Sequence, residues 1–264
     1  MLDAELSLSP LGRAVVESDR QYFELAAATE PLPGATLAFM PGLESLPAAS
    51  VVHRVEPERV DAPLAGWLAL VESRARSLHL SHLRLYLTFE AAAWTSVLNR
   101  HGFTQREEVL FYAPVMPCAQ RDVALVPVEE PRDWKQRAAV FQGDEKGSDS
   151  HPFSPCDWVE LERRKVQTNG LRCLNVLYKN EIAAAVGYLK IRDFFRIKNL
   201  HVRRAWRRQR VGSRVVRAMR AHAYTLQARG CGVMAVNGSH AATLYRKMEM
   251  EQVGVQYEWI KSLR

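Results

Sequence analysis

A dense group of arginines surrounds a single glycine in the C-terminal third of the chain. Residues 203–213 read Arg-Arg-Ala-Trp-Arg-Arg-Gln-Arg-Val-Gly-Ser, and apolar residues then recur at helical spacing from Val215 to Leu226. This pattern predicts a basic loop that leads into an amphipathic helix. Backbone N–H groups at a helix N-terminus attract anions, and phosphates in particular. Gly212 would let the backbone come close to such a ligand, because it has no side chain to hold the ligand away.

A second pattern lies further along, where residues 241–250 read Ala-Ala-Thr-Leu-Tyr-Arg-Lys-Met-Glu-Met. The two patterns resemble those of the GNAT family of acetyl-CoA-dependent acyltransferases. The family's loop reads Arg/Gln-x-x-Gly-x-Gly/Ala, and its later helix ends Ala-x-x-Leu-Tyr-x-Lys-x-Gly-Phe. In this chain Arg210 takes the place of the first glycine, Gly212 keeps the second, and Glu249 and Met250 replace Gly-Phe. The resemblance covers roughly the second half of the chain.

The resemblance implies a binding site for acetyl-CoA as acyl donor, with no metal. In the family, a strand end aligns the pantetheine arm and polarises the thioester carbonyl, and the basic loop holds the phosphates through backbone N–H groups. The predicted ligands are Leu200, His201 and Val202 in the strand, Arg207, Arg208, Gln209, Arg210, Val211, Gly212 and Ser213 in the loop, and Asn237. Asn237 departs from the pattern, since the family's asparagine aligns better with Gly238. An ordinary core strand and a solvated run of charges are the alternatives.

Acetyl transfer to an amine requires a neutral amine, a polarised carbonyl and a proton for the leaving thiolate. The resemblance makes Tyr245 the candidate general acid, and a plain core tyrosine is the alternative. The general base stays open. The glutamate that many family members carry corresponds to Lys198 here, and a lysine serves as a base only if its pKa is strongly lowered. The other candidates are Glu160, Glu162, Asp193, His151, His201 and a water relay.

Alternating and helical patterns predict the elements that position these residues. In the second half, strands are expected at 123–127, 171–178, 182–191 and 195–202, with helices at 132–142, from 156, and after the basic loop. A further strand and the helix that contains Tyr245 are expected to follow. The polar stretch 143–154 reads as a loop. In the family, this loop and the helix after it line the acceptor pocket, so the resemblance makes them the substrate-specific part.

The first half repeats this order in a reduced form. Strands are expected at 35–40, 50–55, 83–87 and 109–112, with helices from 63 and at 91–100, and a short helix capped by Ser18 and Asp19. Residues 92–103 align with the helix before Met250 at a constant offset, which puts Leu98 where Tyr245 lies. No arginine–glycine loop occurs near Pro63. We therefore expect an α/β fold with a mixed sheet and two domains: a degenerate GNAT-like copy at 1–117 and an acetyl-CoA-binding domain at 122–264. The copy is expected to pack and to shape the substrate site, without chemistry, and an unrelated α+β domain is the alternative.

Composition narrows the class of protein. The 264 residues are 47% hydrophobic, which excludes global disorder, and the net charge of +7 is concentrated in the C-terminal quarter. The four cysteines form no CxxC pair, so free thiols are expected rather than a zinc site or disulfides. Neither a signal peptide nor an apolar run of about 20 residues is evident, so a cytoplasmic protein without a membrane partner is expected.

Three functions are compatible with these patterns. The first is an acetyl-CoA-dependent N-acetyltransferase that acts by direct transfer to an amine of a small molecule or peptide. The second is a non-catalytic module that binds or senses acetyl-CoA. The third, nucleic-acid binding through residues 203–220, is disfavoured because that stretch offers mainly arginine and apolar residues rather than groups for base contacts. The acceptor, the acyl chain length and the choice between monomer and homodimer stay open.

Overall fold

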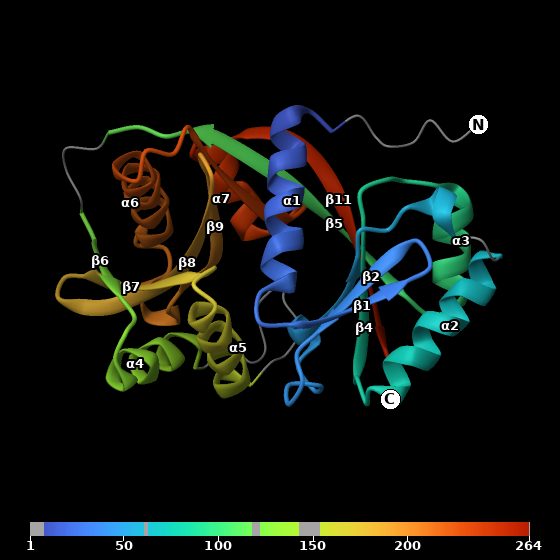
Figure 1. The fold of residues 1–264 in the computed structure, drawn as a ribbon. Helices are drawn as coiled ribbons and strands as arrows, with labels where there is room; N and C mark the ends of the chain where they lie inside the picture. The colour runs from blue at the N-terminus through green and yellow to red at the C-terminus, as the bar shows by residue number, and fades with distance from the viewer. Residues whose placement is uncertain (1–7, 61–62, 118–121, 143–153, 264) are drawn as a thin grey trace.

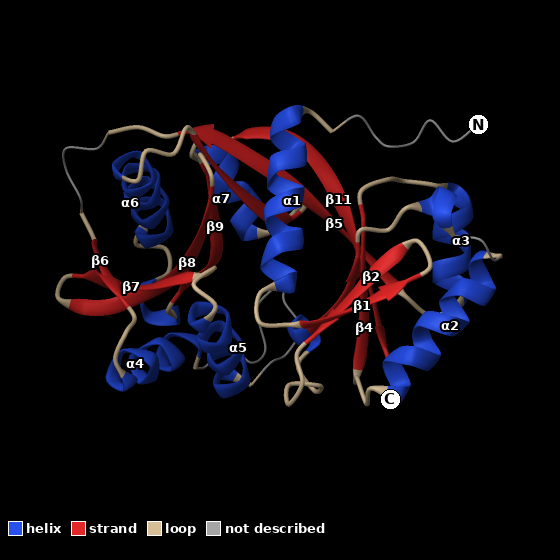
Figure 2. Ribbon diagram, viewed as in Figure 1, coloured by secondary structure: helices blue, strands red, loops and turns tan. Residues whose placement is uncertain are grey.

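Within the residues that the structure describes, eleven strands form one mixed β-sheet (Figures 1 and 2). The structure is a computed structural model, and it describes residues 8–60, 63–117, 122–142 and 154–263. The strands are β1 (Ala28–Leu32), β2 (Ala35–Phe39), β3 (Ser50–His53), β4 (His82–Leu87), β5 (Thr104–Pro114), β6 (Ala124–Pro127), β7 (Arg172–Tyr178), β8 (Glu181–Ile191), β9 (Phe194–Val202), β10 (Gly230–Val236) and β11 (Glu251–Ser262). Their order across the sheet is β1-β2-β3-β4-β11-β5-β10-β9-β8-β7-β6.

Helices cover both faces of the sheet. The described helices are α1 (Pro10–Glu24), α2 (Leu64–Ser77), α3 (Ala92–Arg100), α4 (Pro131–Phe141), α5 (Pro155–Gln167), α6 (Val211–Thr225) and α7 (His240–Lys247), with 3-10 turns η1 (Pro47–Ala49), η2 (Pro57–Arg59) and η3 (Arg204–Trp206). Side chains alternate between the faces of a strand. On β5, Phe111 packs with residues of α6 and α7, whereas Leu110 packs with Val15 and Val16 of α1. Helices α2, α3, α6 and α7 therefore cover one face, and α1, α4 and α5 cover the other.

The two halves of the chain, residues 1–117 and 122–264, exchange their last strands. Strand β5 of the first half lies between β10 and β11 of the second half, and β11 lies between β4 and β5 of the first. Both pairings are antiparallel and long, with Gly230 opposite Pro114 at one end and Ile260 opposite Thr104 at the other. The sheet is therefore continuous, and each half completes the other.

The two halves have the same element order at a nearly constant spacing. Helix α6 begins at Val211 and α2 at Leu64, an offset of 147 residues (211 less 64). Strands β11 and β5 begin at Glu251 and Thr104, which gives the same offset (251 less 104). The predicted fold class, a mixed α/β sheet built from two GNAT-like units with the first one reduced, is confirmed.

Most predicted elements are present, but one helix begins earlier than predicted, two strands were missed and one strand is longer than expected. Helix α1 begins at Pro10, not at Ser18, and Ser9 caps it by accepting a hydrogen bond from the N–H of Gly12 at 3.0 Å. Ser18 and Asp19 lie inside that helix and are buried. Strands β1 and β11 were not predicted, and β5 extends well beyond the expected residues 109–112. The predicted linker and most of the predicted loop, at 118–121 and 143–153, lie outside the described residues.

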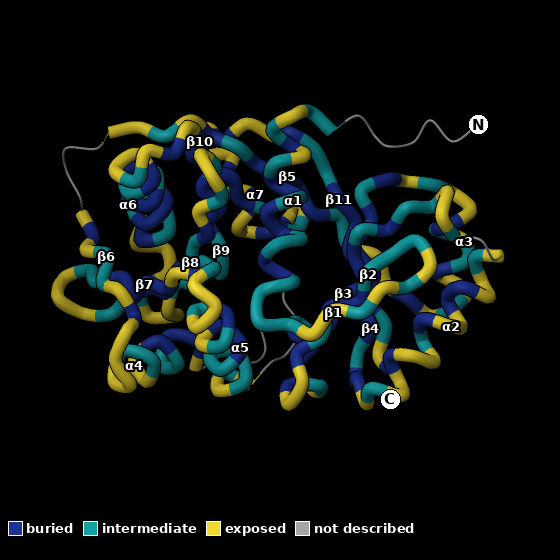
Figure 3. The backbone as a smooth tube through the Cα atoms, in the orientation of Figure 1, coloured by how far each residue is buried: buried dark blue, intermediate teal, exposed yellow. Residues whose placement is uncertain are grey.

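Each half has its own hydrophobic core, and a third cluster joins them. Figure 3 shows buried residues along the strands and helices of both halves. The largest cluster of the second half packs α6 and α7 against the sheet, and that of the first half packs α2 and α3. The joining cluster brings Tyr22, Phe23 and Tyr86 of the first half against Leu171 and Leu189 of the second. No helix in the described part of the chain is long and apolar enough to cross a membrane.

Candidate active site

Strands β9 and β10 separate in the middle of the sheet. Their parallel pairing joins residues 194–196 of β9 to residues 230–232 of β10, and within the described chain it ends there. On the other side, β9 stays paired with β8, with a bulge where Asn199 adopts a left-handed φ of 53°. The N–H of Arg203 donates to Ala183 O on β8, so the N–H of Val202 points the opposite way, toward the gap.

A cavity of about 360 Å³ occupies this gap and takes side chains from both halves. From the second half it is lined by, among others, Ile197, Leu200, His201, Val236, Ser239 and Tyr245. From the first half it is lined by, among others, Tyr22, Phe23, Pro47, Arg84, Tyr86 and Glu108. Of the predicted strand ligands, Leu200 and His201 lie on its wall, and Val202 ends the same strand.

The basic loop folds against the end of β9 and leads into α6. Arg207 Nε donates to Val202 O at 3.0 Å, and Gln209 Nε2 donates to Ala205 O at 3.1 Å. Arg208 and Arg210 both have left-handed φ values, 61° and 59°. Such a conformation favours glycine, the residue that the family's loop pattern has at the place of Arg210. The loop thus has the backbone shape that the pattern predicts.

The first turn of α6 presents its backbone N–H groups without a side-chain cap. Arg210 is the N-cap residue and makes no capping hydrogen bond, so the N–H groups of Val211, Gly212 and Ser213 lead the helix. At Gly212, a Cβ atom would lie 3.1 Å from Leu244 Cδ2 and 3.8 Å from Val202 Cγ2. The glycine therefore also permits close packing of α6 against α7 and β9. A positive helix end among arginines suits a phosphate ligand.

Tyr245 of α7 lies on the cavity wall and packs against Phe111, with 5.7 Å between ring centroids. It is buried in the core of the second half. Burial raises the pKa of the Tyr245 phenol to about 12, and the nearby positive charge of Arg196 opposes that rise. The phenol is therefore protonated at neutral pH, the state that a general acid needs.

Asn237 is held in a turn after β10. Its amide Nδ2 donates to Glu107 Oε1 at 2.8 Å, and its Oδ1 accepts hydrogen bonds from the N–H of Gly238 and from Arg246 Nη2. In this arrangement the amide of Asn237 is bound to protein groups on both sides, and Asn237 is not among the residues that line the cavity.

Buried charges fasten α1 to β9 beside the gap. Asp19 Oδ1 accepts hydrogen bonds from Arg196 Nη2 at 2.9 Å and from Lys198 Nζ at 2.8 Å. The two positive groups hold the pKa of Asp19 below its usual range against the opposing effect of burial. At the other end of α1, Lys165 Nζ of α5 donates to the carbonyls of Tyr22 and Leu25, the last turn of the helix.

Two carboxylates from the first half's side of the sheet lie in the cavity. Glu108 of β5 and Glu258 of β11 are both buried, and Arg84 Nε donates to Glu258 Oε1 at 2.5 Å. Gln256 Nε2 donates to Glu108 Oε2 at 2.9 Å. Burial, followed by the negative charge of Glu258, raises the pKa of Glu108 to about 8.

The family assignment agrees with this geometry. Residues 132–250 match the model of the acetyltransferase (GNAT) family. These residues form a GNAT domain. The match includes α4, α5, the splayed strands, the basic loop and α7. No curated protein matches the sequence.

Solved structures of the same fold cover nearly the whole chain. A conserved protein of unknown function from Staphylococcus epidermidis is 12% identical, with a TM-score of 0.70 over 90% of this chain and 95% of that one. A GCN5-related N-acetyltransferase from Kribbella flavida is 13% identical, with a TM-score of 0.65 over 94% of each chain. A tandem GNAT protein from the clavulanic acid biosynthesis pathway is 11% identical, with a TM-score of 0.56 over 96% of each. Identities this low support the fold alone.

The candidate bases that the GNAT patterns left open have other contacts. Glu162 is buried against Arg137, with Arg137 Nε 2.5 Å from Glu162 Oε2, and it also accepts from Asn199. Glu160 pairs with arginines of its own helix, and Asp193 pairs with Arg229 at the surface. The ring of His201 packs against Phe141 at 5.0 Å. His151 lies outside the described residues.

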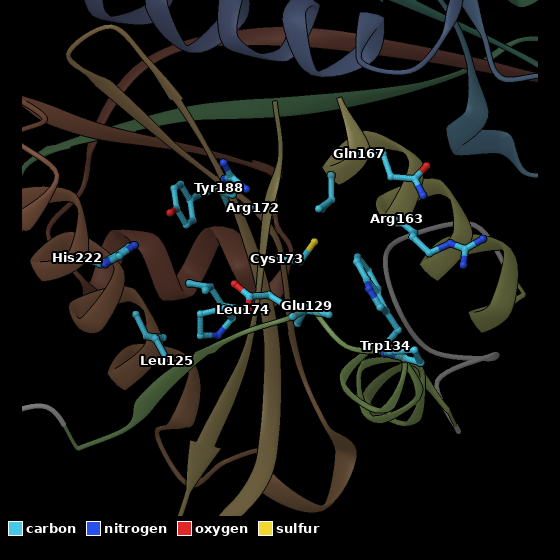
Figure 4. Close-up of a pocket in the computed structure, with 14 residues that line it drawn as sticks. Leu125, Glu129, Trp134, Arg163, Gln167, Arg172, Cys173, Leu174, Tyr188 and His222 are labelled. Atoms are coloured by element: carbon cyan, nitrogen blue, oxygen red, sulfur yellow. The ribbon is translucent and has the colours of Figure 1, made fainter. Parts of the chain in front are cut away.

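A second cavity, of about 800 Å³, lies at the β6 edge of the GNAT domain (Figure 4). Trp134 of α4, Arg163 and Gln167 of α5 and His222 of α6 surround the strand residues Arg172, Cys173 and Leu174 there. None of the predicted acetyl-CoA ligands lines it. Cys173 and Cys231 are buried free thiols, Cys156 is an exposed one, and Cys118 lies outside the described residues. Within the described chain, no group of three or more His, Cys, Asp or Glu side chains is placed to hold a metal ion.

Sequence reasoning missed Glu108 and Glu258. A glutamate in an alternating strand normally faces solvent, so Glu108 gave no local signal. Its burial depends on β10 and β11, whose residues are more than a hundred positions away. Glu258 lies in a strand that was not predicted.

Proposed function

We propose that the protein is an acetyl-CoA-dependent N-acetyltransferase that transfers the acetyl group directly to an amine. The observation that carries this proposal is the gap between β9 and β10, which opens beside the uncapped first turn of α6 within a GNAT domain. The pyrophosphate would lie at the N–H groups of Val211, Gly212 and Ser213, with Arg207, Arg208, Gln209 and Arg210 around it. The pantetheine arm would enter along Leu200, His201 and Val202.

In this proposal the transfer uses a proton that Tyr245 holds at neutral pH. As the C–S bond breaks, the phenol donates to the sulfur of the departing thiolate. The N–H groups of β9 that face the gap would polarise the thioester carbonyl. Asn237 could contact the pantetheine arm, as the resemblance implies, only if its turn rearranges when acetyl-CoA binds.

The acceptor would bind on the α1 side of the same cavity, where the first half supplies Tyr22, Phe23, Pro47 and Tyr86. The proposed domains, 1–117 and 122–264, would then share one active site, since each contributes cavity residues. The acceptor is an amine of a small molecule or peptide.

A calorimetric titration with acetyl-CoA tests the donor site. Gly212→Asp puts a carboxylate at the proposed pyrophosphate position, and we expect at least a tenfold loss of affinity, about 1.4 kcal/mol. Gly212→Asn has the same size without the charge and separates repulsion from crowding against Leu244.

The internal repeat supplies a second control. Ala65 is exposed and occupies in α2 the place that Gly212 has in α6. Ala65→Asp should leave the affinity unchanged. Absence of binding by the wild-type protein would refute the proposed function.

A coenzyme-binding protein without turnover is the second candidate. It is favoured by Lys198, which replaces the family's glutamate and is bound to Asp19. Binding of acetyl-CoA together with a lack of CoA release on a broad panel of amines would support it.

A further inference from the structure

The proposed reaction needs a group that takes a proton from the acceptor amine. Lys198, at the position of the family's usual glutamate, donates to Asp19; burial lowers the pKa of its ammonium group, and the negative charge of Asp19 opposes that fall. Because the Nζ of Lys198 is already bound to Asp19, a carboxylate of the cavity is the better-placed base. Among the described side chains that line it, the carboxylates are Glu108 and Glu258.

Register places Glu108 next to the gap. On β5 it lies opposite Val236 of β10, a residue of the cavity wall, and opposite Gln256 of β11. Neighbouring strands are about 4.8 Å apart, so Glu108 is one strand spacing from the wall where β10 separates from β9. Its side chain points to the α1 face, because Phe111, three residues on, packs against Tyr245 on the other face.

We propose that Glu108, carried into the active site by the last strand of the first half, is the general base for the acceptor amine. This inference rests on the proposed function. It puts the acid and the base on opposite faces of the sheet, with the gap between them: Tyr245 from the second half, Glu108 from the first. It also gives the first half a chemical role that its sequence did not predict.

The contacts of the two carboxylates distinguish Glu108 from Glu258. Glu258 accepts a hydrogen bond from Arg84, and Tyr86 Oη also donates to it at 3.3 Å, so its charge is already compensated. Glu108 receives a single hydrogen bond, from the neutral amide of Gln256, at Oε2. No described residue donates to its Oε1, which leaves that oxygen for an amine.

The surroundings of Glu108 weaken it as an acid at neutral pH. Groups from every neighbouring element face it: Glu258 and Gln256 on β11, Arg84 and Tyr86 on β4, Arg106 on β5, Arg196 and Lys198 on β9, and Asp19 on α1. Burial and the charge of Glu258 raise the pKa of Glu108 to about 8, and Arg84 and Gln256 oppose that rise. A carboxylate of this strength is matched to an amine.

The proton balance closes with these two residues. The Glu108 carboxylate takes one proton from the ammonium group, and the freed lone pair forms the C–N bond at the thioester carbon. The C–S bond breaks with its electron pair on sulfur, which takes the proton of Tyr245. The nitrogen then loses its second proton to the Tyr245 phenolate. The products are the amide, the CoA thiol and protonated Glu108, which releases its proton to water.

The test measures release of the CoA thiol at saturating acetyl-CoA from pH 6 to 10, with a panel of amino acids, polyamines, aminoglycosides and lysine peptides. Glu108→Gln should lower kcat by about 100-fold or more and remove the rise in rate around pH 8. Acetyl-CoA affinity, measured calorimetrically, should stay within twofold, which shows that the variant is folded. Glu107→Gln, on the opposite face of the same strand, should behave as the wild type.

A second variant keeps the proposal testable if Glu108→Gln is unstable. Glu258→Gln removes the charge that raises the pKa of Glu108, so the rise in rate should move to lower pH. The proposal is overturned if Glu108→Gln turns over within threefold of the wild type, or if the pH profile of Glu258→Gln does not move downward. Those results would not contradict the proposed acetyltransferase function. If acetyl-CoA binds but no amine of the panel causes thiol release, both the proposed acetyltransferase function and the proposed role of Glu108 are refuted.

Discussion

The two halves of this chain share an order of elements but differ in what lies beside the corresponding helices α6 and α2. In the second half, strands β9 and β10 part and leave a cavity beside the start of α6. At the offset of 147 residues, the first half has Leu98 in place of Tyr245 and Trp67 in place of Arg214. Trp67 is buried and packs edge-on against Trp94, with 5.6 Å between ring centroids. The first copy therefore packs aromatic side chains beside α2, whereas the second copy has a cavity near the start of α6.

The first copy, which has no arginine–glycine loop, still contributes to the shared cavity. It supplies the exchanged strand β5, helix α1 and part of the cavity wall. One cluster of buried charges, Asp19 with Arg196 and Lys198, lies between the halves. The reduced copy is therefore a structural part of the cavity that the proposed reaction uses.

The largest effect on stability is expected at Trp67, where aromatic packing fills the first copy. Trp67→Ala should lower the free energy of unfolding by about 4 kcal/mol, because it opens a large cavity and removes the hydrogen bond from Trp67 Nε1 to Pro33 O. Arg214→Ala, at the matching place in α6, should cost about 1 kcal/mol or less, since that side chain is partly exposed. Urea denaturation measures both. Equal losses would mean that the two helices are packed alike.

The next effect concerns the charges between the halves. Asp19→Asn leaves Arg196 and Lys198 without their carboxylate in a buried place, so we expect a loss of about 3 kcal/mol. Glu30→Gln breaks the Arg74–Glu30 pair within the first half, which is partly exposed, and should cost less than about 1 kcal/mol. Thermal unfolding of the two variants gives the comparison, and a small loss for Asp19→Asn would contradict it.

The next prediction concerns the rate of the proposed reaction and Tyr245, which corresponds to Leu98 in the first copy. In the proposed reaction, Tyr245→Phe removes only the hydroxyl group, so kcat should fall about 100-fold while acetyl-CoA affinity stays unchanged. Tyr257→Phe is the control, because the Tyr257 hydroxyl donates to Glu90 Oε2 at 3.1 Å. Tyr257 is not among the residues that line the cavity. A Tyr245→Phe variant with wild-type kcat would leave Tyr245 as a core residue.

Local patterns in the sequence were enough to predict most elements and the basic loop before α6. Period-2 and helical spacing are properties of neighbouring residues, and so is the run from Arg207 to Ser213. The exchange of β5 and β11 could not be seen in this way, because pairing across more than a hundred residues leaves no local mark. Asp19 shows the consequence: next to Ser18 it reads as a helix cap, whereas its buried position inside α1 depends on the distant Arg196 and Lys198.

The smallest of the expected effects also depends on the exchanged strand. The folded-state pKa of Glu108, about 8, lies above the ordinary value of 4.5, so its stabilising contribution is complete below about pH 4.5 and is lost as the pH rises toward 8. Between pH 5 and pH 7 this amounts to about 2.5 kcal/mol, since one pKa unit corresponds to about 1.4 kcal/mol. Glu108→Gln cannot ionise and should lose less stability over that range, whereas Glu107→Gln should follow the wild type. Urea denaturation at the two pH values measures the difference. Identical pH dependence in Glu108→Gln and the wild type would show that the strand exchange does not desolvate this carboxyl group.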